Sequence, residues 1–463
     1  MEAKPVSTAI PEIQPVTITP PDWNNRQLFK LLWPLIVEQL LIVTMGIIDM
    51  VMVSSVGEHA VSGVSLVDTV NFLFVTAFSA MATGGSVVAS QYLGRKDSKN
   101  ACSSARQLIY ISVSISVVIM VLTMLLCRIM LSAIYGNIAG DVMQAAQTYF
   151  LITALSYPFL ALHTSTSAIY RSMGKSNITM WAAVLVNIIK VAGNALFIYY
   201  MGLGVAGAAL STLIARIVIS FLLVTYLTQD WAHVVNLKGL TKIKLEKVMI
   251  KRILNIGIPS GLETSMFQIG KVLIMRIFTA FGTAALAANA VSGTINSIAF
   301  MPGSAFGMGL LIIAGQFIGA GDYDGAKRFT KKMIKMSYVT YLLININILI
   351  FMNPIIGIFN LSAEAYRLCV IFLRIHLVTS TLFWCPSFVL PNALKAAGDA
   401  KYVMVVAAST MWLVRVCSAF LMAFPLGLGP TAVSLAMGAD FLFRGIFFTK
   451  RWLNGRWMDK RVI

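Results

Sequence analysis

The sequence predicts an all-α polytopic membrane protein whose 12 transmembrane helices form two six-helix lobes. Three observations lead to this prediction. Hydrophobic residues make up 58% of the 463 residues and charged residues only 12%, which is far from the composition of a soluble domain. Several apolar runs reach the roughly 20 residues needed to cross about 30 Å of hydrocarbon. Motifs of the first half also return in the second half, at an offset of about 225 residues.

The apolar runs fix where the chain crosses the membrane. The predicted spans are 28–55, 63–90, 107–127, 145–168, 178–200, 204–227, 255–280, 287–317, 336–359, 366–392, 401–424 and 428–448. Lys and Arg concentrate in the two tails and the even-numbered loops. The positive-inside rule therefore predicts a multi-pass protein of the cytoplasmic (inner) membrane with both termini in the cytosol. Anionic lipid headgroups explain the net charge of +18 without nucleic acid as a partner.

The same pattern predicts the domain organisation. A cytosolic tail (1–25) precedes an N-terminal lobe (26–226), and a linker (227–254) leads to a C-terminal lobe (255–448) and a second cytosolic tail (449–463). The second half of the linker is rich in Lys and amphipathic. It is expected either to lie on the cytosolic membrane surface or to be a solvated basic loop.

The internal repeat extends over several separate segments. Trp33-Pro34 followed by Glu38 returns as Ile258-Pro259 followed by Glu263. The run GGSVVASQYLG (84–94) returns as GLLIIAGQFIG (309–319), and YRSMGKSNITM (170–180) returns as LKAAGDAKYVM (394–404). Six spans per copy bring both copies in from the same side of the membrane. The repeats are therefore parallel, as in transporters that rock one half against the other around a central site.

Two acids lie in the first span. Glu38 and Asp49 are 11 residues apart, so they share one helix face and lie about 16 Å apart along its axis. An ionisable side chain in a membrane helix costs about 2.5 to 3.5 kcal/mol on insertion scales and usually faces a partner or a cavity. Asp49 has Ile274 as its repeat counterpart, and this asymmetry favours a functional role over a purely structural ion pair.

The other polar residues of the spans have repeat counterparts. Glu38 matches Glu263, and for both acids a structural ion pair and a cation site remain open alternatives. Asn71 and Gln91 match Asn296 and Gln316, so hydrogen bonding between helices is favoured over a role in lining the cavity. The cations that could reach buried carboxylates are Lys271, Arg276 and Arg415. Asp440 and Arg444 are four residues apart near the end of the last helix and predict a structural ion pair.

The motifs resemble those of the multidrug and toxic compound extrusion (MATE) transporters. The resemblance rests on the order and spacing of MGIIDMVMVSSVG (45–57), SQYLGRKDSKNA (90–101), YRSMGKS (170–176) and similar stretches up to residue 457. It implies a twelve-helix, two-lobed exporter of amphipathic, often cationic compounds, driven by the entry of Na⁺ or H⁺. Asp49 matches the family's first-helix Asp, which takes part in cation coupling.

The fifth span departs from the family pattern. The family often has an Asn and an Asp four residues apart before a Phe-Ile pair, and here Lys190 and Asn194 occupy these positions, with Asn187 one turn earlier. A Lys near Asp49 would compete with Na⁺, so a proton-operated Asp–Lys pair is an alternative to Na⁺ at Asp49. A further alternative is that Lys190 snorkels or packs against another acid.

The second lobe lacks the acids of some family branches. Phe267 and Gln268 stand where those branches carry an essential acid, and LFWCPSFVLPNALK (382–395) contains none. The pattern is similar to the DinF-like branch, which relies on the Asp of the first lobe.

Other function classes are less well supported. A flippase for lipid-linked oligosaccharides is the main alternative, since Lys190, Lys271, Arg276 and Arg415 could line a cavity for pyrophosphate. A membrane enzyme would need a motif such as HExxH or GxSxG in a span, and a channel would need a filter-like motif. The four His and five Cys residues show no metal-ligand spacing. We therefore expect a non-enzymatic monomer that binds small molecules and lipids and needs no cofactor beyond the coupling ion.

Overall fold

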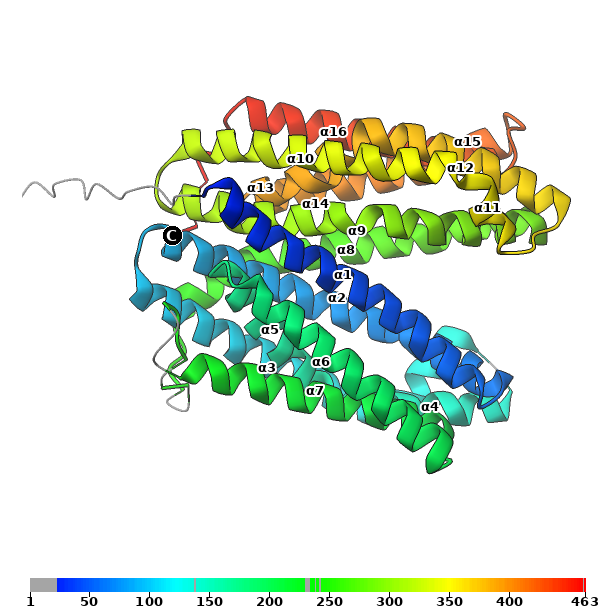
Figure 1. The fold of residues 1–463 in the computed structure, drawn as a ribbon, viewed down its shortest axis with the longest axis horizontal. Coiled ribbons are helices and arrows are strands. Elements are labelled where there is room, and N and C mark those ends of the chain that lie inside the picture. The colour runs from blue at the N-terminus through cyan, green and yellow to red at the C-terminus, as the bar shows by residue number, and fades with distance from the viewer. Residues whose placement is uncertain (1–22, 137–138, 230–233, 238, 241–242, 461) are drawn as a thin grey trace, which may run out of the picture.

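The computed structural model describes residues 23–136, 139–229, 234–237, 239–240, 243–460 and 462–463, and these residues form helices and no strands. Figure 1 shows two helical bundles, α1–α7 and α8–α16. The bundles lie against each other at the end where the chain termini lie, and they diverge toward the opposite end. The molecule therefore has the two-lobed form that the repeat predicts.

The first lobe contains the N-terminal copy of the repeat. Its elements are α1 (Asn25–Ser54), α2 (Glu58–Gly94), α3 (Ser98–Tyr135), α4 (Gly140–Leu155), α5 (Tyr157–Ser172), α6 (Ser176–Asn194), the π-helical η1 (Ala195–Tyr200) and α7 (Gly204–Thr228). Helices α4 and α5 meet at a bend of 49° and together form one span.

The second lobe contains the C-terminal copy. Its elements are α8 (Lys247–Ala280), α9 (Thr283–Gly319), α10 (Tyr323–Ile350), α11 (Met352–Gly357), α12 (Ala363–Trp384), the π-helical η2 (Cys385–Val389), α13 (Leu390–Ala396), α14 (Ala400–Ser409), the π-helical η3 (Thr410–Val416), α15 (Cys417–Ala423) and α16 (Thr431–Leu453).

The number of helices agrees with twelve crossings. Among the described residues, ten helices and the bent pair α4–α5 are long and apolar enough to cross a membrane. Helix α8 has 34 residues and occupies the position that α1 has in the first lobe. It does not reach the same hydropathy because polar residues such as Glu263, Gln268 and Lys271 interrupt its apolar run. With α8 the total is twelve.

The repeat extends to the turns between helices. The Asp97 side chain caps α3 by accepting from the Asn100 N–H at 3.1 Å, and Asp322, 225 residues later, caps α10 by accepting from the Gly325 N–H at 2.7 Å. Gly174 and Gly398 have φ angles of 74° and 88°, which favour glycine over residues with a Cβ. The same local sequence thus ends and restarts helices identically in both lobes.

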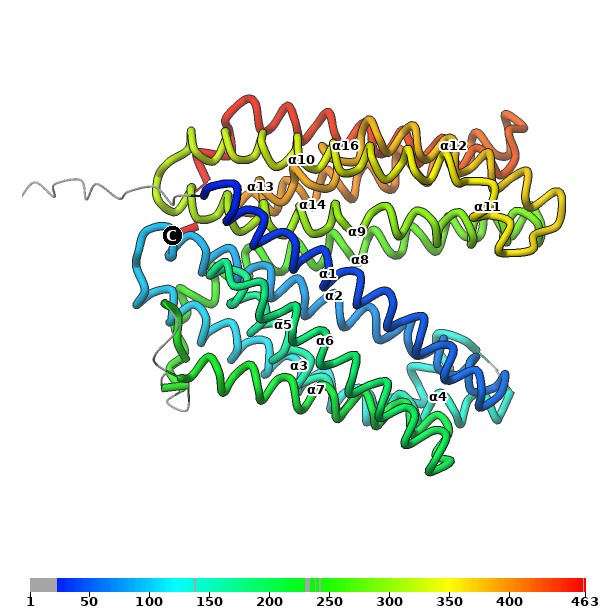
Figure 2. The backbone as a smooth tube through the Cα atoms, in the orientation of Figure 1, coloured from blue at the N-terminus to red at the C-terminus, as the bar shows by residue number. Residues whose placement is uncertain are grey.

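The lobes cross at the ends of α2 and α9 (Figure 2), where the backbones of these two helices come very close. A Cβ atom on Gly94 would lie 1.9 Å from the Gln316 carbonyl oxygen, and one on Gly319 would lie 2.0 Å from that of Gln91. The Gln91 Nε2 donates to the Ala396 carbonyl oxygen at 2.7 Å. The Gln316 Nε2 donates to the carbonyl oxygen of Ser172, the repeat counterpart of Ala396, at 2.9 Å. These contacts hold the two lobes together at the termini side.

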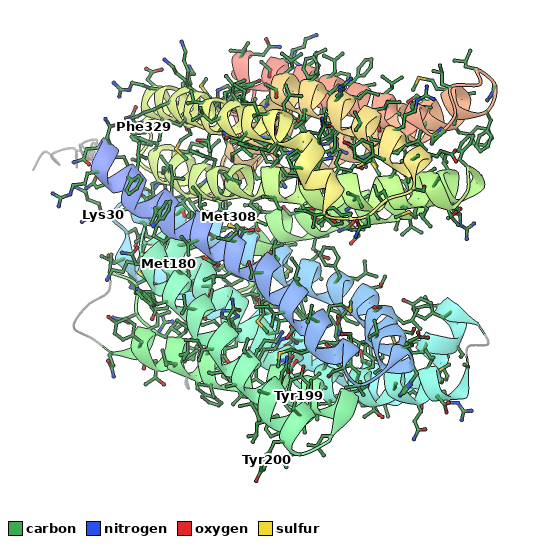
Figure 3. The ribbon with its side chains drawn as sticks, turned by 45° about the vertical axis from the view of Figure 1, so that its right-hand side comes forward. Lys30, Met180, Tyr199, Tyr200, Met308 and Phe329 are labelled. Atoms are coloured by element: carbon green, nitrogen blue, oxygen red, sulfur yellow. The ribbon has the colours of Figure 1, made fainter. Side chains whose placement is uncertain are left out.

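Helix α1 lies between the lobes along much of its length. It packs against α6 of its own lobe and against α9 of the other. Figure 3 shows its Lys30 end near α10, with Met308 of α9 on one side of the helix and Met180 of α6 on the other. Because α1 touches both lobes, a change in the position of one lobe relative to the other would change the surroundings of the side chains on α1.

The linker is shorter than the predicted 227–254, because Lys247 already begins α8. Whether its Lys-rich part lies on the membrane surface or is solvated stays a prediction. The preceding described residues lie on α3, because Tyr110 donates to the Leu240 carbonyl oxygen at 2.7 Å and the Ser103 hydroxyl donates to the Glu246 carboxylate at 2.7 Å. Residues 1–22 of the predicted N-terminal tail lie outside the described residues.

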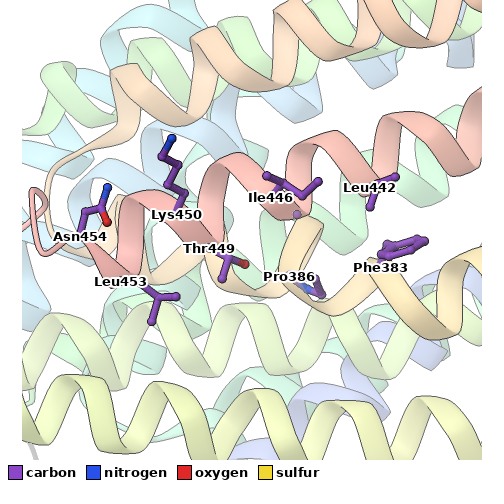
Figure 4. A pocket seen from close by; sticks show the side chains of 9 residues that line it. Phe383, Pro386, Leu442, Ile446, Thr449, Lys450, Leu453 and Asn454 are labelled. Atoms are coloured by element: carbon purple, nitrogen blue, oxygen red, sulfur yellow. The ribbon is translucent and has the colours of Figure 1, made fainter.

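Exposed apolar side chains cover the outer faces of the lobes. Leu125 and Leu453, for example, are 73% and 75% exposed, as expected for a surface in contact with lipid. A hollow of about 480 Å³ lies on the C-terminal lobe. Figure 4 shows side chains that line it, among them Phe383, Ile446, Leu453 and Lys450. Its apolar lining suits a lipid chain.

The crossing of α2 and α9 leads to a prediction about stability. Gly94→Ala places a methyl group against the Gln316 carbonyl oxygen, and such overpacking costs about 1–3 kcal/mol or more. We expect the thermal unfolding midpoint of the full chain in detergent to fall. Gly293→Ala is the matched control, because a Cβ there meets nothing within 4 Å. Equal midpoints for the two variants would contradict a tight crossing.

Candidate functional site

The centre of the N-terminal lobe holds a polar cluster around Asp49 of α1. One Asp49 oxygen forms an ion pair with the Lys190 Nζ of α6. The other accepts from the Asn194 Nδ2 of the same helix at 2.9 Å. The Ser211 hydroxyl of α7 donates to the Asn194 Oδ1, which turns the amide nitrogen toward Asp49. The sequence-predicted Asp49, Lys190 and Asn194 therefore lie together, and both Asp49 oxygens face nitrogen donors.

Of the remaining predicted residues of the fifth and second spans, Asn71 reaches this cluster by interacting with Asp68 of α2, whereas Asn187 lies outside it. The Asn187 Nδ2 donates to the Leu41 carbonyl oxygen at 3.1 Å and so ties α6 to α1. Asn71 of α2 accepts from the Tyr157 hydroxyl at 2.6 Å. Both contacts are hydrogen bonds between helices, which is the role that the repeat favours for Asn71.

Asp68 of α2 is a member of the cluster that sequence reasoning missed. It is exposed, and the Tyr149 hydroxyl of α4 donates to its Oδ1 at 3.3 Å. Asp68 also interacts electrostatically with Lys190 and Asp49. The signal was available, because Asp68 is an acid inside an apolar span, as Asp49 is. Its repeat counterpart is Gly293, so it too breaks the symmetry.

The two glutamates at equivalent positions form equivalent ion pairs. The Glu38 carboxylate binds the Arg171 guanidinium at 2.8 Å and also accepts from the Thr179 hydroxyl at 2.7 Å. The Glu263 carboxylate binds the Lys395 ammonium at 2.6 Å. Lys395 is the repeat counterpart of Arg171, so each lobe ties its first helix to the end of its fourth span in the same way.

Gln91 lies apart from the Asp49 cluster. It is on the same helix as Asp68 but 23 residues further along, about 35 Å at 1.5 Å per residue. Its side chain takes part in the crossing of the lobes and bonds to the other lobe, as described above. Gln91 therefore belongs to the contact between lobes and not to a cavity.

The C-terminal lobe holds a different cluster. Asp440 is fully buried and binds the Arg444 Nε at 2.8 Å, which confirms the predicted ion pair. The Arg415 Nη1 lies 3.8 Å from the other Asp440 oxygen. Arg444 also donates to the Thr410 hydroxyl at 3.0 Å. This lobe therefore has arginines around a single buried acid, where the first lobe has two acids around a lysine.

These arrangements allow reversible binding of a proton or of a charged compound. Among the described residues, no group of three His, Cys, Asp or Glu side chains lies close enough to hold a metal ion. Carboxylates within an apolar bundle can change their charge when a proton or a cation arrives, and a nearby ammonium group responds to that change.

Comparison with known proteins identifies the family. The MatE family model matches residues 34–196 and 259–421, one match in each lobe. The chain belongs to the MATE family. It is 28% identical to the uncharacterized transporter YisQ of Bacillus subtilis over 94% of this chain and 95% of YisQ. It is 23% identical to the probable multidrug resistance protein NorM of Thermotoga maritima, over 95% of this chain and 94% of NorM.

Solved structures share the fold. A crystal structure of a MATE protein in the straight conformation superposes with a TM-score of 0.87, with 18% identity, over 94% of this chain and 97% of that one. MATE proteins are multi-pass membrane transporters of small molecules. The MATE family and the twelve-helix fold implied by the resemblance are confirmed, and the DinF-like branch stays a prediction.

The paired glutamates of this MATE chain lead to a second prediction. Glu38→Met leaves Arg171 largely buried without its partner, and loss of one member of a buried pair costs about 3–5 kcal/mol. The thermal midpoint in detergent should therefore fall strongly. The double variant Glu38→Met/Arg171→Met removes both charges and should recover much of the loss. A double variant as unstable as the sum of the single variants would rule out this coupling.

Proposed function

We propose that this chain exports amphipathic compounds with a cationic group in exchange for entering protons, and that Asp49 is the coupling residue. The ion pair between Asp49 and Lys190 is the observation that carries the proposal. Two family relatives bear the name probable multidrug resistance protein, in Thermotoga maritima and in Bacillus subtilis. With the predicted cytosolic termini, the diverging ends of the lobes face outward, which suits release of a compound to the outside.

The partners of Asp49 favour H⁺ over Na⁺ as the coupling ion. Na⁺ is a hard cation that is bound by several oxygen ligands. The two Asp49 oxygens instead face the Lys190 ammonium and the Asn194 amide nitrogen. A proton needs only one lone pair of the carboxylate. Its arrival neutralises Asp49 and removes the charge that holds Lys190.

Three charged or titratable groups from neighbouring helices face the pair of Asp49 and Lys190. Asp68 comes from α2, Tyr149 from α4 and Arg216 from α7, and each interacts electrostatically with Asp49, while Lys190 comes from α6. Among the described residues, Asp68 has no cation within ion-pair distance. When Asp49 is protonated, Asp68 is therefore the carboxylate available to Lys190.

This arrangement couples two events through one lysine. While Asp49 is ionised it holds Lys190, and the exposed Asp68 is free to bind the cationic group of a compound. Protonation of Asp49 releases Lys190 toward Asp68, where the ammonium group competes with the bound compound. Proton entry and compound release are then opposite sides of the same exchange, as antiport requires.

Efflux of a fluorescent cationic dye from proteoliposomes tests this function. A proton gradient alone should drive efflux and a Na⁺ gradient alone should not. Asp49→Asn should lower proton-driven efflux to the rate seen without a gradient. Asp68→Asn should raise the KM for the dye about tenfold or more, because a hydrogen bond to a charged group contributes about 1.5–3 kcal/mol.

Asp324→Asn is the matched control, because its side chain is 95% exposed at the start of α10 and lies away from the cluster. It should transport as the wild type does. Efflux driven by Na⁺ alone would refute proton coupling. Efflux that survives Asp49→Asn would leave an exporter but remove Asp49 as its coupling residue.

A further inference from the structure

The C-terminal lobe carries positive charge that its own acids do not match. In this lobe Glu263 pairs with Lys395, and Asp440 pairs with Arg444. Of the other cations in the spans of this lobe, Lys271 and Arg415 lie at the same aromatic ring, that of Phe267. Among the described residues, Lys271 has no acid within ion-pair distance, and Arg415 reaches only the already paired Asp440, at 3.8 Å. Unmatched charge in an apolar bundle is costly, so a compensating anion is expected nearby.

These unmatched cations gather at one aromatic ring. The Phe267 ring centroid lies 5.9 Å from the Lys271 Nζ and 5.7 Å from the Arg415 guanidinium carbon. Arg444 lies 5.2 Å from the same centroid. A ring face attracts cations but carries no net charge, so the three groups still repel one another. An anion beside Phe267 would relieve this repulsion.

Two buried donors on the element that carries Arg415 have no acceptor among the described residues. The Arg415 Nε and the Trp412 Nε1 are buried, and neither has a hydrogen-bond partner among the described residues. The side chain of Arg415 is only 8% exposed. Both residues lie on the π-helical η3, three positions apart. An unsatisfied buried donor costs about 1–3 kcal/mol, so two of them together point to a missing group that supplies acceptor atoms.

The cluster can be reached from the side where the lobes diverge. Helices α2 and α8 touch where Gly84 meets Gly257. Lys271 lies 14 residues beyond Gly257 on α8, about 21 Å further toward the open end. Its side chain is exposed, and Phe267 is half-buried. Of the two cations, Lys271 is therefore the one at the surface, and Arg415 lies buried beside Phe267.

We propose that Lys271 and Arg415 bind the anionic group, a carboxylate or a phosphate, of the amphipathic compounds that this chain transports. Phe267 and Trp412 contact the apolar body beside that group. The inference rests on the proposed export function and specifies its substrates, which carry a negative group for this site together with the positive group bound by Asp68. The transported compounds are then zwitterionic, not simply cationic.

Two dyes that differ in one carboxylate test this site. Rhodamine B is zwitterionic at neutral pH, whereas its ethyl ester keeps the same ring system and only the positive charge. We would measure binding of both by fluorescence polarisation, with the full chain in phosphatidylcholine nanodiscs and without any ion gradient. Wild type should bind the acid more tightly than the ester. Lys271→Gln should weaken binding of the acid about tenfold and leave that of the ester unchanged.

The controls use the same helix. Lys251→Gln removes an equal charge from an exposed site near the start of α8 and should keep the preference for the acid. Lys271→Arg keeps a positive charge at this position and should show the preference for the acid that Lys271→Gln loses. A second set of nanodiscs contains phosphatidylglycerol. Weaker acid binding there in wild type, but not in Lys271→Gln, would assign the anion to a lipid phosphate.

The inference is overturned if the wild type binds both dyes equally well. It is also overturned if Lys271→Gln changes the affinity for both dyes equally and phosphatidylglycerol has no effect on binding. Because binding is measured without a gradient, this result is independent of coupling. Asp49→Asn could abolish proton-driven efflux and still keep the preference for the acid. A failure of the proposed function and a failure of this site would therefore be distinguished.

Discussion

The close crossing of α2 and α9 is the constraint on which the arrangement of the two lobes depends. Glycine at positions 94 and 319 lets each helix approach the backbone of the other, because any Cβ there would clash. It would lie 1.9 Å from the Gln316 carbonyl oxygen at position 94 and 2.0 Å from the Gln91 carbonyl oxygen at position 319. Gln91 and Gln316 then bridge to the opposite lobe in equivalent ways. Because the lobes meet at this end, their helices diverge at the other, and the charged clusters lie along the diverging part.

The internal repeat separates architecture from function. Features present in both lobes maintain the fold, such as the helix caps Asp97 and Asp322 and the glutamate–base pairs. Features present in only one lobe lie at the candidate sites. Asp49 has Ile274 as its counterpart, and Lys271 has Gly46. Lys190 and Arg415 occupy equivalent positions and both are basic. Lys190 pairs with Asp49 of α1, whereas Arg415 lies near Asp440 of α16.

The sequence predicted the fold well because its signals are local or periodic. Apolar runs, loop charge and the offset of the repeat can all be read without knowing which helices touch. The polar partners could not be predicted in this way. That Glu38 would meet Arg171 and Thr179 depends on how three helices pack. The docking of the linker on α3 depends on side-chain hydrogen bonds to backbone groups that have no sequence pattern of their own.

Asp68 is a different kind of omission. Its sequence signal equals that of Asp49, because each is an acid inside an apolar span and neither has an acid at the equivalent position of the other lobe. Its importance follows from packing, because α2 brings it to the same lysine that pairs with Asp49. The site therefore has two carboxylates near one lysine, an arrangement that depends on the packing of three helices.

The strengths of these contacts suit a transporter that rocks its lobes. The charged pairs lie within a lobe, since Glu38 and Arg171 belong to the first and Glu263 and Lys395 to the second. Breaking such a pair costs several kcal/mol, so each lobe is expected to move as a unit. The glutamine bridges between the lobes are hydrogen bonds that each contribute only about 1 kcal/mol net. The hydrogen bonds between the lobes are therefore individually weaker than the ion pairs inside each lobe, and Asp49 lies on α1, the helix that touches both lobes.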